Sequence, residues 1–163
     1  MLFFRQLISI LILPGTVLVL VPRWLLRGEG TQLTWPPGLR GAAGIAVFLL
    51  GFVFFAWSVS LFTRVGRGTL APWDPTRKLV AVGPYRYVRN PMISGVVFML
   101  AGEAIFFGSR SVATWAATFL LVNHVYFVLL EEPGLEEKFG EEYRAYKARV
   151  PRWIPRLRPW TGA

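Results

Sequence analysis

The chain of 163 residues has no cysteine and only one histidine, His124. Without cysteine it can form no disulfide, no thiolate zinc site and no cysteine nucleophile. A single histidine excludes most metal sites, and it leaves His124 as the only imidazole available to a Ser/His/Asp triad. The sequence therefore predicts no metal site.

Charged residues are also scarce. They make up 17% of the chain, below the quarter or so that is usual in soluble domains, whereas 54% is hydrophobic. The formal net charge is nevertheless +9. A basic chain can bind nucleic acid, but here the Lys and Arg residues flank long apolar runs. We therefore predict a membrane with anionic lipid as the partner, and no nucleic acid.

Four apolar runs predict an all-α, integral membrane fold with four transmembrane helices. They cover about residues 2–21, 41–62, 92–108 and 112–130. A bilayer core of about 30 Å needs about 20 helical residues, and only the third run falls short. Three residues, Ser109-Arg110-Ser111, join the third run to the fourth. We expect this pair to form an antiparallel hairpin that spans as a unit.

The positive-inside rule sets the expected orientation. Fourteen of the 18 Lys and Arg residues lie at Arg5, in the 63–91 loop or after residue 132, which predicts that both termini are cytoplasmic. No small-x-small cleavage site follows the first run, so we expect a retained helix, kinked at Pro14. The single membrane domain (1–163) then divides into two N-terminal helices (1–62), a cytoplasmic loop (63–91), a hairpin (92–130) and a cytoplasmic tail (131–163).

The tail has the pattern of an amphipathic helix between residues 133 and 150. Leu135, Phe139, Tyr143 and Tyr146 recur at spacings of three and four, which places them on one helical face. Such a helix can lie on the membrane surface, or it can cover a site at the cytoplasmic mouth of the hairpin. The sequence leaves both alternatives open.

Polar residues converge at one end of the predicted hairpin, from the 83–91 loop, from Glu131-Glu132 and from the tail. Asn90 can cap the third helix with Pro91 at its first position, which leaves backbone N–H groups that could receive a carboxylate. Glu131 or Glu132 could accept hydrogen bonds from ribose hydroxyls and would favour a cation. The pattern suits a sulfonium cofactor.

Each of these features also has an ordinary structural interpretation. A helix that starts with Pro is common, and a Glu pair beside basic residues is usually a solvated salt-bridge network. Ser94 and Gly95 would let a ligand approach the backbone closely. His124 lies seven positions before Glu131 on the same helical face, where it could line a cavity or pack as a hydrogen-bonded histidine.

Two blocks of sequence carry a family resemblance. Gly-Pro-Tyr-Arg-Tyr-Val-Arg-Asn-Pro-Met at 83–92 resembles the signature before the penultimate helix of the isoprenylcysteine carboxyl methyltransferase and phospholipid methyltransferase superfamily. Glu131-Glu132 and Val-Pro-Arg-Trp-Ile-Pro at 150–155 resemble its C-terminal signature. The resemblance implies S-adenosylmethionine as cofactor, bound between the blocks, and a lipid-like methyl acceptor.

The resemblance also implies roles for individual residues. Glu131, Glu132 and Arg144 are the candidate catalytic residues. Together with the residues singled out above, the candidate cofactor-binding set is Gly83, Pro84, Tyr85, Arg89, Asn90, Pro91, Ser94, Gly95, His124, Glu131, Glu132 and Tyr143.

The acceptor is open between a phospholipid amine headgroup and a prenylcysteine-like carboxylate. Asn90 and Ile93 stand where the prenylcysteine branch usually has His and Tyr, and Glu-Glu-Pro at 131–133 looks more like the phosphatidylethanolamine branch. A carboxylate needs no base, whereas an amine must lose a proton to Glu131, Glu132 or water. Two rival functions are a nicotinamide-dependent membrane reductase of the sterol-reductase type and a catalytically silent membrane scaffold.

Overall fold

All the regular secondary structure is helical in the part of the chain that the computed structural model describes, residues 14–31, 38–66 and 78–162. This confirms the predicted all-α class. In chain order the elements are η1 (Thr16–Leu20), α2 (Val21–Gly28), α3 (Leu39–Arg64), η2 (Gly83–Arg86), α4 (Pro91–Phe107), α5 (Arg110–Tyr126), η3 (Phe127–Glu131), α6 (Glu132–Phe139) and α7 (Glu141–Arg149). The elements η1 and η3 are π-helical turns, which are wider than an α-helix, and η2 is a tighter 3-10 turn.

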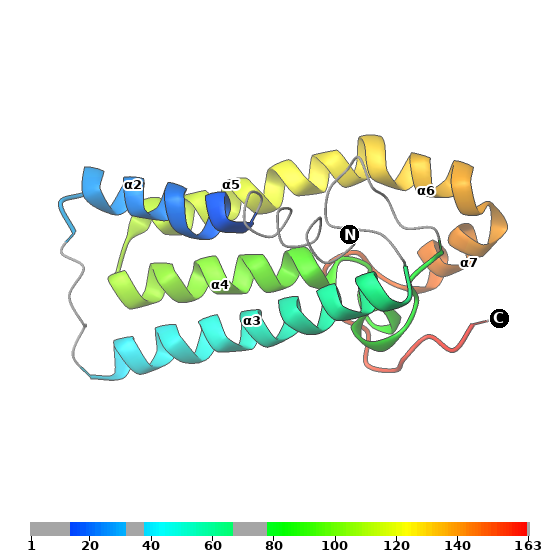
Figure 1. Cartoon of the computed structure of the whole chain (residues 1–163), viewed down its shortest axis with the longest axis horizontal. Coiled ribbons are helices and arrows are strands. Elements are labelled where there is room, and N and C mark those ends of the chain that lie inside the picture. Colours follow the sequence, from blue (N-terminus) through cyan, green and yellow to red (C-terminus); the bar gives the residue numbers. More distant parts are fainter. Residues whose placement is uncertain (1–13, 32–37, 67–77, 163) are drawn as a thin grey trace.

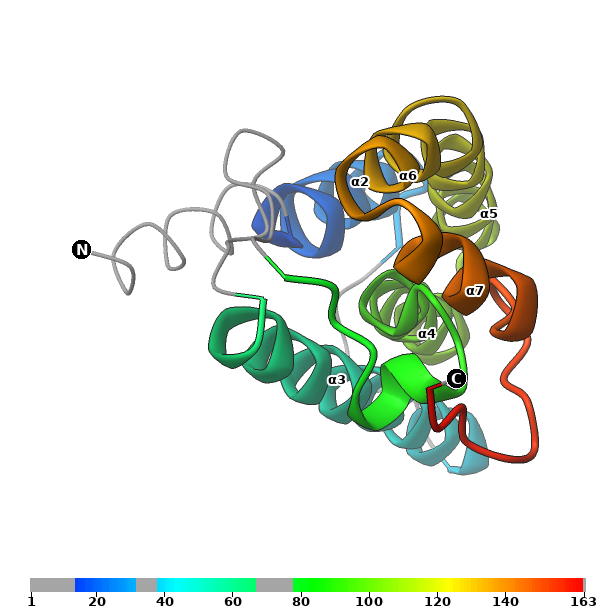
Figure 2. The ribbon, with the colours of Figure 1, turned by 90° about the vertical axis from the view of Figure 1, so that its right-hand side faces the viewer.

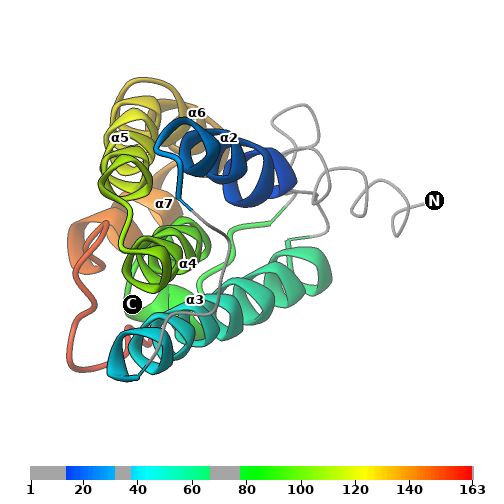
Figure 3. The same ribbon diagram turned by 90° about the vertical axis from the view of Figure 1, so that its left-hand side faces the viewer.

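The long helices run side by side along the long axis of the molecule (Figure 1). α4 runs back antiparallel to α3, and α5 returns in the direction of α3 and continues through η3 into α6. End-on views place α4 in the middle, with α3, α5 and the η1–α2 segment around it (Figures 2 and 3). The core follows from this position: Val96, Met99 and Leu100 of α4 pack with Phe55 of α3 and Ala116 of α5.

α3 and α4 touch through glycines spaced seven residues apart on each helix. A Cβ added at Gly51 would lie 2.6 Å from the Gly95 carbonyl oxygen, and one at Gly102 would lie 2.7 Å from the Gly44 carbonyl oxygen. Contacts this short to backbone atoms leave no room for a side chain. The glycines therefore let the two helix backbones approach closely, as small residues do in membrane helix pairs.

The predicted hairpin is present, and Glu29, which follows α2, binds to its turn. Only Gly108 and Ser109 separate α4 from α5. The Ser109 hydroxyl accepts from the Val112 N–H (3.1 Å) and donates to Glu29 (2.5 Å), and Glu29 also accepts the Ser111 N–H (2.9 Å). These hydrogen bonds, that from Ser109 first, hold the pKa of the Glu29 carboxyl below its usual value. Glu29 thus ties the end of α2 to the start of α5.

Two helical stretches are long and apolar enough to cross a membrane, Leu39–Phe62 and Arg110–Phe139. Many of their large apolar side chains are exposed, as lipid-facing side chains would be; examples are Leu50, Phe52, Val53, Leu121, Val122 and Leu129. At 17 residues α4 is shorter. Residues 1–13 of the predicted first span and 67–77 of the predicted loop lie outside the described residues. Four spans and cytoplasmic termini stay predictions.

Two predicted boundaries are wrong. The first helix does not end near Val21 but continues to Gly28, because η1 runs into α2 without a break at Pro22. The wider π-type turn of η1 lies just before the proline, as is common where proline interrupts helical hydrogen bonding. The predicted tail helix over 133–150 is two helices. α6 continues the rod of α5, and the chain then turns at Gly140 (φ +56°, ψ −129°) into α7. Few residues other than glycine adopt that backbone conformation.

Candidate active site

The loop that leads into α4 is fixed by contacts on two sides. Gly83 opens η2 with a φ of +56°, which strains any larger residue, and an added Cβ would lie 2.5 Å from the end of the Leu61 side chain of α3, which would have to move. On the other side, the Tyr146 hydroxyl of α7 donates to the Tyr85 carbonyl (2.7 Å). Pro84 and Tyr85 are consequently buried. The loop is held between α3 and the C-terminal part of the chain.

The C-terminal segment 150–162 runs back along the same loop, near the right-hand end of the molecule in Figure 1. Hydrogen bonds join the loop and the segment along their length. The connecting hydrogen bonds are Arg89 N–H to the Pro151 carbonyl (2.9 Å), Arg156 N–H to the Tyr87 carbonyl (3.0 Å), Trp160 N–H to the Arg86 carbonyl (2.9 Å) and Arg86 Nε to the Trp160 carbonyl (2.5 Å).

α4 begins where the sequence predicts, with Asn90 at the N-cap and Pro91 at the first position. The Asn90 side chain, however, makes no capping hydrogen bond. The backbone carbonyl of Asn90 accepts both the N–H and the hydroxyl of Ser94 (3.0 Å each). The N–H groups of the first turn therefore receive no side-chain cap from Asn90.

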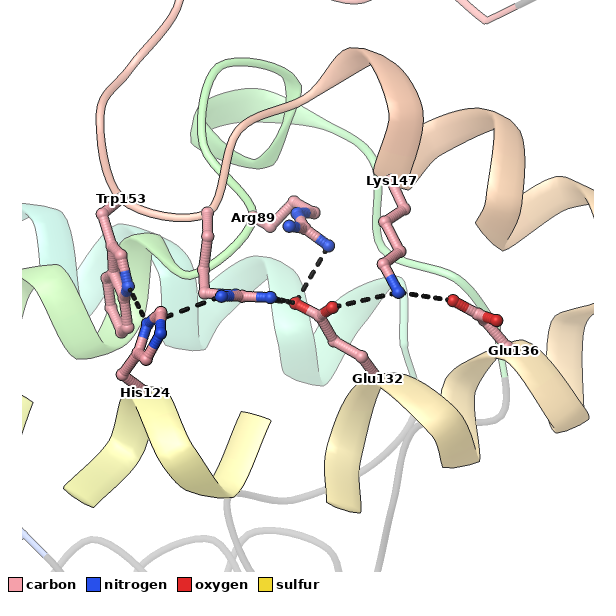
Figure 4. Close-up of polar contacts among 7 residues, drawn as sticks. Arg89, His124, Glu132, Glu136, Lys147 and Trp153 are labelled. Atoms are coloured by element: carbon pink, nitrogen blue, oxygen red, sulfur yellow. Dashed lines mark hydrogen bonds and ion pairs between the residues drawn. The ribbon is translucent and has the colours of Figure 1, made fainter. Parts of the chain in front are cut away.

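Glu132 is the centre of an ion-pair network (Figure 4). Its side chain is 6% exposed. One carboxylate oxygen accepts Arg152 (Nη2 2.7 Å, Nε 2.8 Å) and lies 3.0 Å from Arg89 Nη1, and the other lies 3.2 Å from Lys147 Nζ. Lys147 also donates to Glu136 (2.6 Å). Charge-assisted contacts from three cations offset the cost of burying this carboxylate. Glu132 thereby joins α6 to the loop, to α7 and to the C-terminal segment.

His124 takes part in the same network, one side chain further along (Figure 4). Its Nδ1 accepts the Trp153 indole N–H (2.9 Å) and lies 3.5 Å from Arg152 Nη1. Because an indole nitrogen only donates, Nδ1 must be unprotonated and the ring hydrogen must sit on Nε2. The Trp153 ring also packs against Phe127 (centroids 5.8 Å apart). The structure therefore places His124 in a packed, hydrogen-bonded contact, while a role for it in cofactor binding stays a prediction.

Buried donors beside this network have no hydrogen-bond partner among the described residues. They are the Tyr85 hydroxyl and Arg89 Nε and Nη1, although Nη1 keeps its ion pair with Glu132 at an angle that makes no hydrogen bond. Burial raises the pKa of the Tyr85 phenol well above its usual range, and nearby Tyr146 and Glu131 raise it further. A buried, unpaired donor costs about 1–3 kcal/mol, so an acceptor that binds at this place would recover that free energy.

Not all predicted site residues come together. Tyr143 is buried beside Tyr146 and Val150, and burial raises its pKa. Arg144 does not join the site, because its side chain is 54% exposed and pairs with Glu141 (2.8 Å). Gly95 does not line it either: an added Cβ would lie 2.8 Å from backbone atoms of Gly51 and Phe55 in α3, so its open side is filled by helix packing.

Sequence reasoning did not identify Lys147 as a partner of Glu132, nor Trp153 as the donor to His124. The available signal was the excess of basic residues in the tail opposite an acidic pair. That signal indicates a network of ion pairs but does not assign partners, because the assignment depends on the turn at Gly140.

Comparison with known proteins decides the family. Residues 39–142, about two thirds of the chain, match the phospholipid methyltransferase family. The chain belongs to this family. The matched range includes α3, the loop, α4, α5 and Glu131-Glu132, and it ends before Lys147 and Arg152. The family is membrane-integral, which agrees with the two apolar rods described above.

Curated relatives give a similar result over shorter ranges. An uncharacterised protein of Haemophilus influenzae is 33% identical over 63 residues, 39% of this chain and the whole of that protein. Methanethiol S-methyltransferase 1 of Bradyrhizobium diazoefficiens is 33% identical over 82 residues, 44% of this chain. Methanethiol S-methyltransferase of Pseudomonas deceptionensis is 35% identical over 82 residues, 48% of this chain. The chain spans only 24% and 29% of the two named enzymes.

Proposed function

We propose that the protein is a membrane methyltransferase that takes its methyl group from S-adenosylmethionine and transfers it to a lipid-like acceptor. Membership of the family supports methyl transfer at a membrane. The observation that carries the proposal is the group of unpaired buried donors on Tyr85 and Arg89, close to Glu131 at the end of the hairpin.

The residues present fit this cofactor in charge and in hydrogen bonding. Its carboxylate needs donors, and the Tyr85 hydroxyl, Arg89 Nε and the N–H groups at the start of α4 are available for it. Its ribose hydroxyls need a hydrogen-bond acceptor, and its cationic end needs a negatively charged group nearby. Glu131 suits both, since its carboxylate accepts no hydrogen bond from the described residues.

The two adjacent glutamates have different roles in this proposal. Both oxygens of Glu132 are engaged by cations of the protein, so Glu132 positions the loop and the tail. The Glu131 oxygens accept no hydrogen bond from the described residues and can therefore accept hydrogen bonds from a bound ligand. When bound, S-adenosylmethionine supplies an electrophilic methyl group on a cationic sulfur. The protein aligns the acceptor with that methyl group, and Glu131 accepts the proton that the acceptor loses.

A phospholipid amine headgroup is the acceptor that we propose. A free carboxylate at the site attracts an ammonium group and repels the carboxylate of a prenylcysteine. A thiol, the acceptor that the names of two relatives indicate for those enzymes, would also need a base. Labelled methyl transfer into total membrane lipids, with methanethiol tested in parallel, distinguishes a lipid amine from a small thiol.

Calorimetric titration of the purified protein with S-adenosylhomocysteine and with NADPH tests the cofactor. We expect S-adenosylhomocysteine to bind, and Glu131→Gln to weaken it about ten- to hundredfold, the loss expected for a hydrogen bond to a charged group. Glu141→Gln, which removes an exposed carboxylate outside the site, is the matched control. Binding of NADPH alone would support a reductase instead, and binding of neither would support a scaffold.

A further inference from the structure

Two large apolar side chains near the C-terminus are exposed although the backbone around them is held in place. Ile154 is 80% exposed and Leu157 is 100% exposed. The backbone on each side of Leu157 is hydrogen bonded to the site loop, through the N–H groups of Arg156 (3.0 Å) and Trp160 (2.9 Å). Leu157 is therefore presented outward by a fixed segment and does not belong to a loose end.

Positive charge surrounds these side chains. Arg149 and Arg158 are exposed, and the Arg156 guanidinium donates to the Arg149 carbonyl (3.0 Å) and pairs with no carboxylate of the described residues. The last acidic residue of the chain is Glu142, so no negative charge follows within the sequence. Exposed apolar side chains bordered by arginines are the composition of segments that lie in the headgroup region of an anionic bilayer.

The position of the segment agrees with this composition. It lies at the level of the end of α3 along the long axis (Figure 1), and at the outer edge of the molecule, on the side of α7, when the helices are viewed end-on (Figure 2). The exposed apolar side chains of α3 and α5 continue along that axis toward the opposite end. A bilayer that surrounds these helices would have its headgroup region at the level of the C-terminal segment.

We propose that residues 154–158 are an interfacial anchor, which places Ile154 and Leu157 among the headgroups of an anionic leaflet and its arginines near lipid phosphates. Through the hydrogen bonds to Arg86 and Tyr87, the anchor holds the site loop at the membrane surface. This inference lies outside the family match, which ends at residue 142, and it does not depend on the proposed methyl transfer.

Spin labelling tests the anchor directly, because the chain has no native cysteine to label by mistake. Leu157→Cys carries the label in the full-length protein, reconstituted in nanodiscs of phosphatidylcholine alone or mixed with phosphatidylglycerol. Collision with oxygen, which concentrates in lipid, is compared with collision with a water-soluble nickel chelate. Glu141→Cys, at the exposed turn after α6, is the aqueous reference position.

We expect the label at position 157 to favour oxygen, more strongly in discs that contain phosphatidylglycerol, while the label at 141 favours nickel in both. Adding Arg158→Gln should reduce the inserted fraction in phosphatidylglycerol discs by about fivefold relative to the free fraction, and high salt should do the same. Arg144→Gln, which removes an exposed arginine that already pairs with Glu141, should change nothing. Equal nickel collision at 157 and 141 in both lipids would overturn the anchor and leave the segment as a surface for an acidic protein.

Discussion

Replacing Glu132 with glutamine should release the C-terminal part of the protein from the rest. The substitution keeps the size of the side chain and removes its charge. Arg89 and Arg152, whose side chains are 10% and 18% exposed, then lose the carboxylate that compensates them. Lys147 is 37% exposed and keeps Glu136, so it loses less.

The magnitude follows from burial. Removing one partner of a buried ion pair costs about 3–5 kcal/mol, because the remaining charge stays poorly hydrated. The exposed Lys147 contact adds at most about 1 kcal/mol. Because the glutamine amide retains part of the hydrogen bonding, we expect about 3 kcal/mol. At about 1.4 kcal/mol for each factor of ten, this is on the order of a hundredfold increase in the undocked population.

Hydrogen exchange measures this population. The N–H groups of Arg89, Arg156 and Trp160 bond across the junction between the loop and the C-terminal segment. They should exchange about a hundredfold faster in Glu132→Gln, while amides in the middle of α4 should be unchanged. Glu141→Gln, which removes an exposed pair with Arg144, should leave all of them unaffected. Equal protection in the two variants would refute the reasoning that Glu132 holds the tail.

Two further predictions concern packing and pH. Gly51→Ala should destabilise the protein by about 1–3 kcal/mol in thermal unfolding, because its Cβ meets α4 backbone, whereas Gly134→Ala, with open space around it, should be neutral or slightly stabilising. The pKa of Glu29 is lowered by folding, so its stabilising effect is present above the usual value of 4.5 and lost as pH falls below it. Unfolding temperature against pH should therefore drop more steeply below about 4.5 in the native protein than in Glu29→Gln. Parallel curves would contradict this role of Glu29.

Much of the fold could be predicted because helix length and apolar composition are local properties. The hairpin and the start of α4 at Asn90 and Pro91 are examples. The path of the tail could not be predicted in the same way. The apolar spacing from Leu135 to Tyr146 continues through Gly140 as if the helix were unbroken, and the positive φ of that one residue turns the chain back.

The candidate site was predictable as a region but not as a set of contacts. The loop at 83–91 and Glu131-Glu132 are polar and lie at the same end of the predicted hairpin, and this predicted that they share one site. The sequence could not show that Gly95 serves helix packing, because a glycine close to a ligand and a glycine close to another backbone look alike. Nor could it show that Arg144 pairs with Glu141, since a short-range ion pair on one helix competes with any site across the fold.

The close contact of α3 and α4 at their glycines has a consequence for how an acceptor reaches the site. With Gly51 and Gly95 backbone to backbone near the site end, no lipid chain can pass between these two helices. The proposed lipid acceptor would therefore have to reach the site around this pair of helices and not between them. The face of α4 toward α5 is closed as well, because Met99 and Leu100 are buried in the core there.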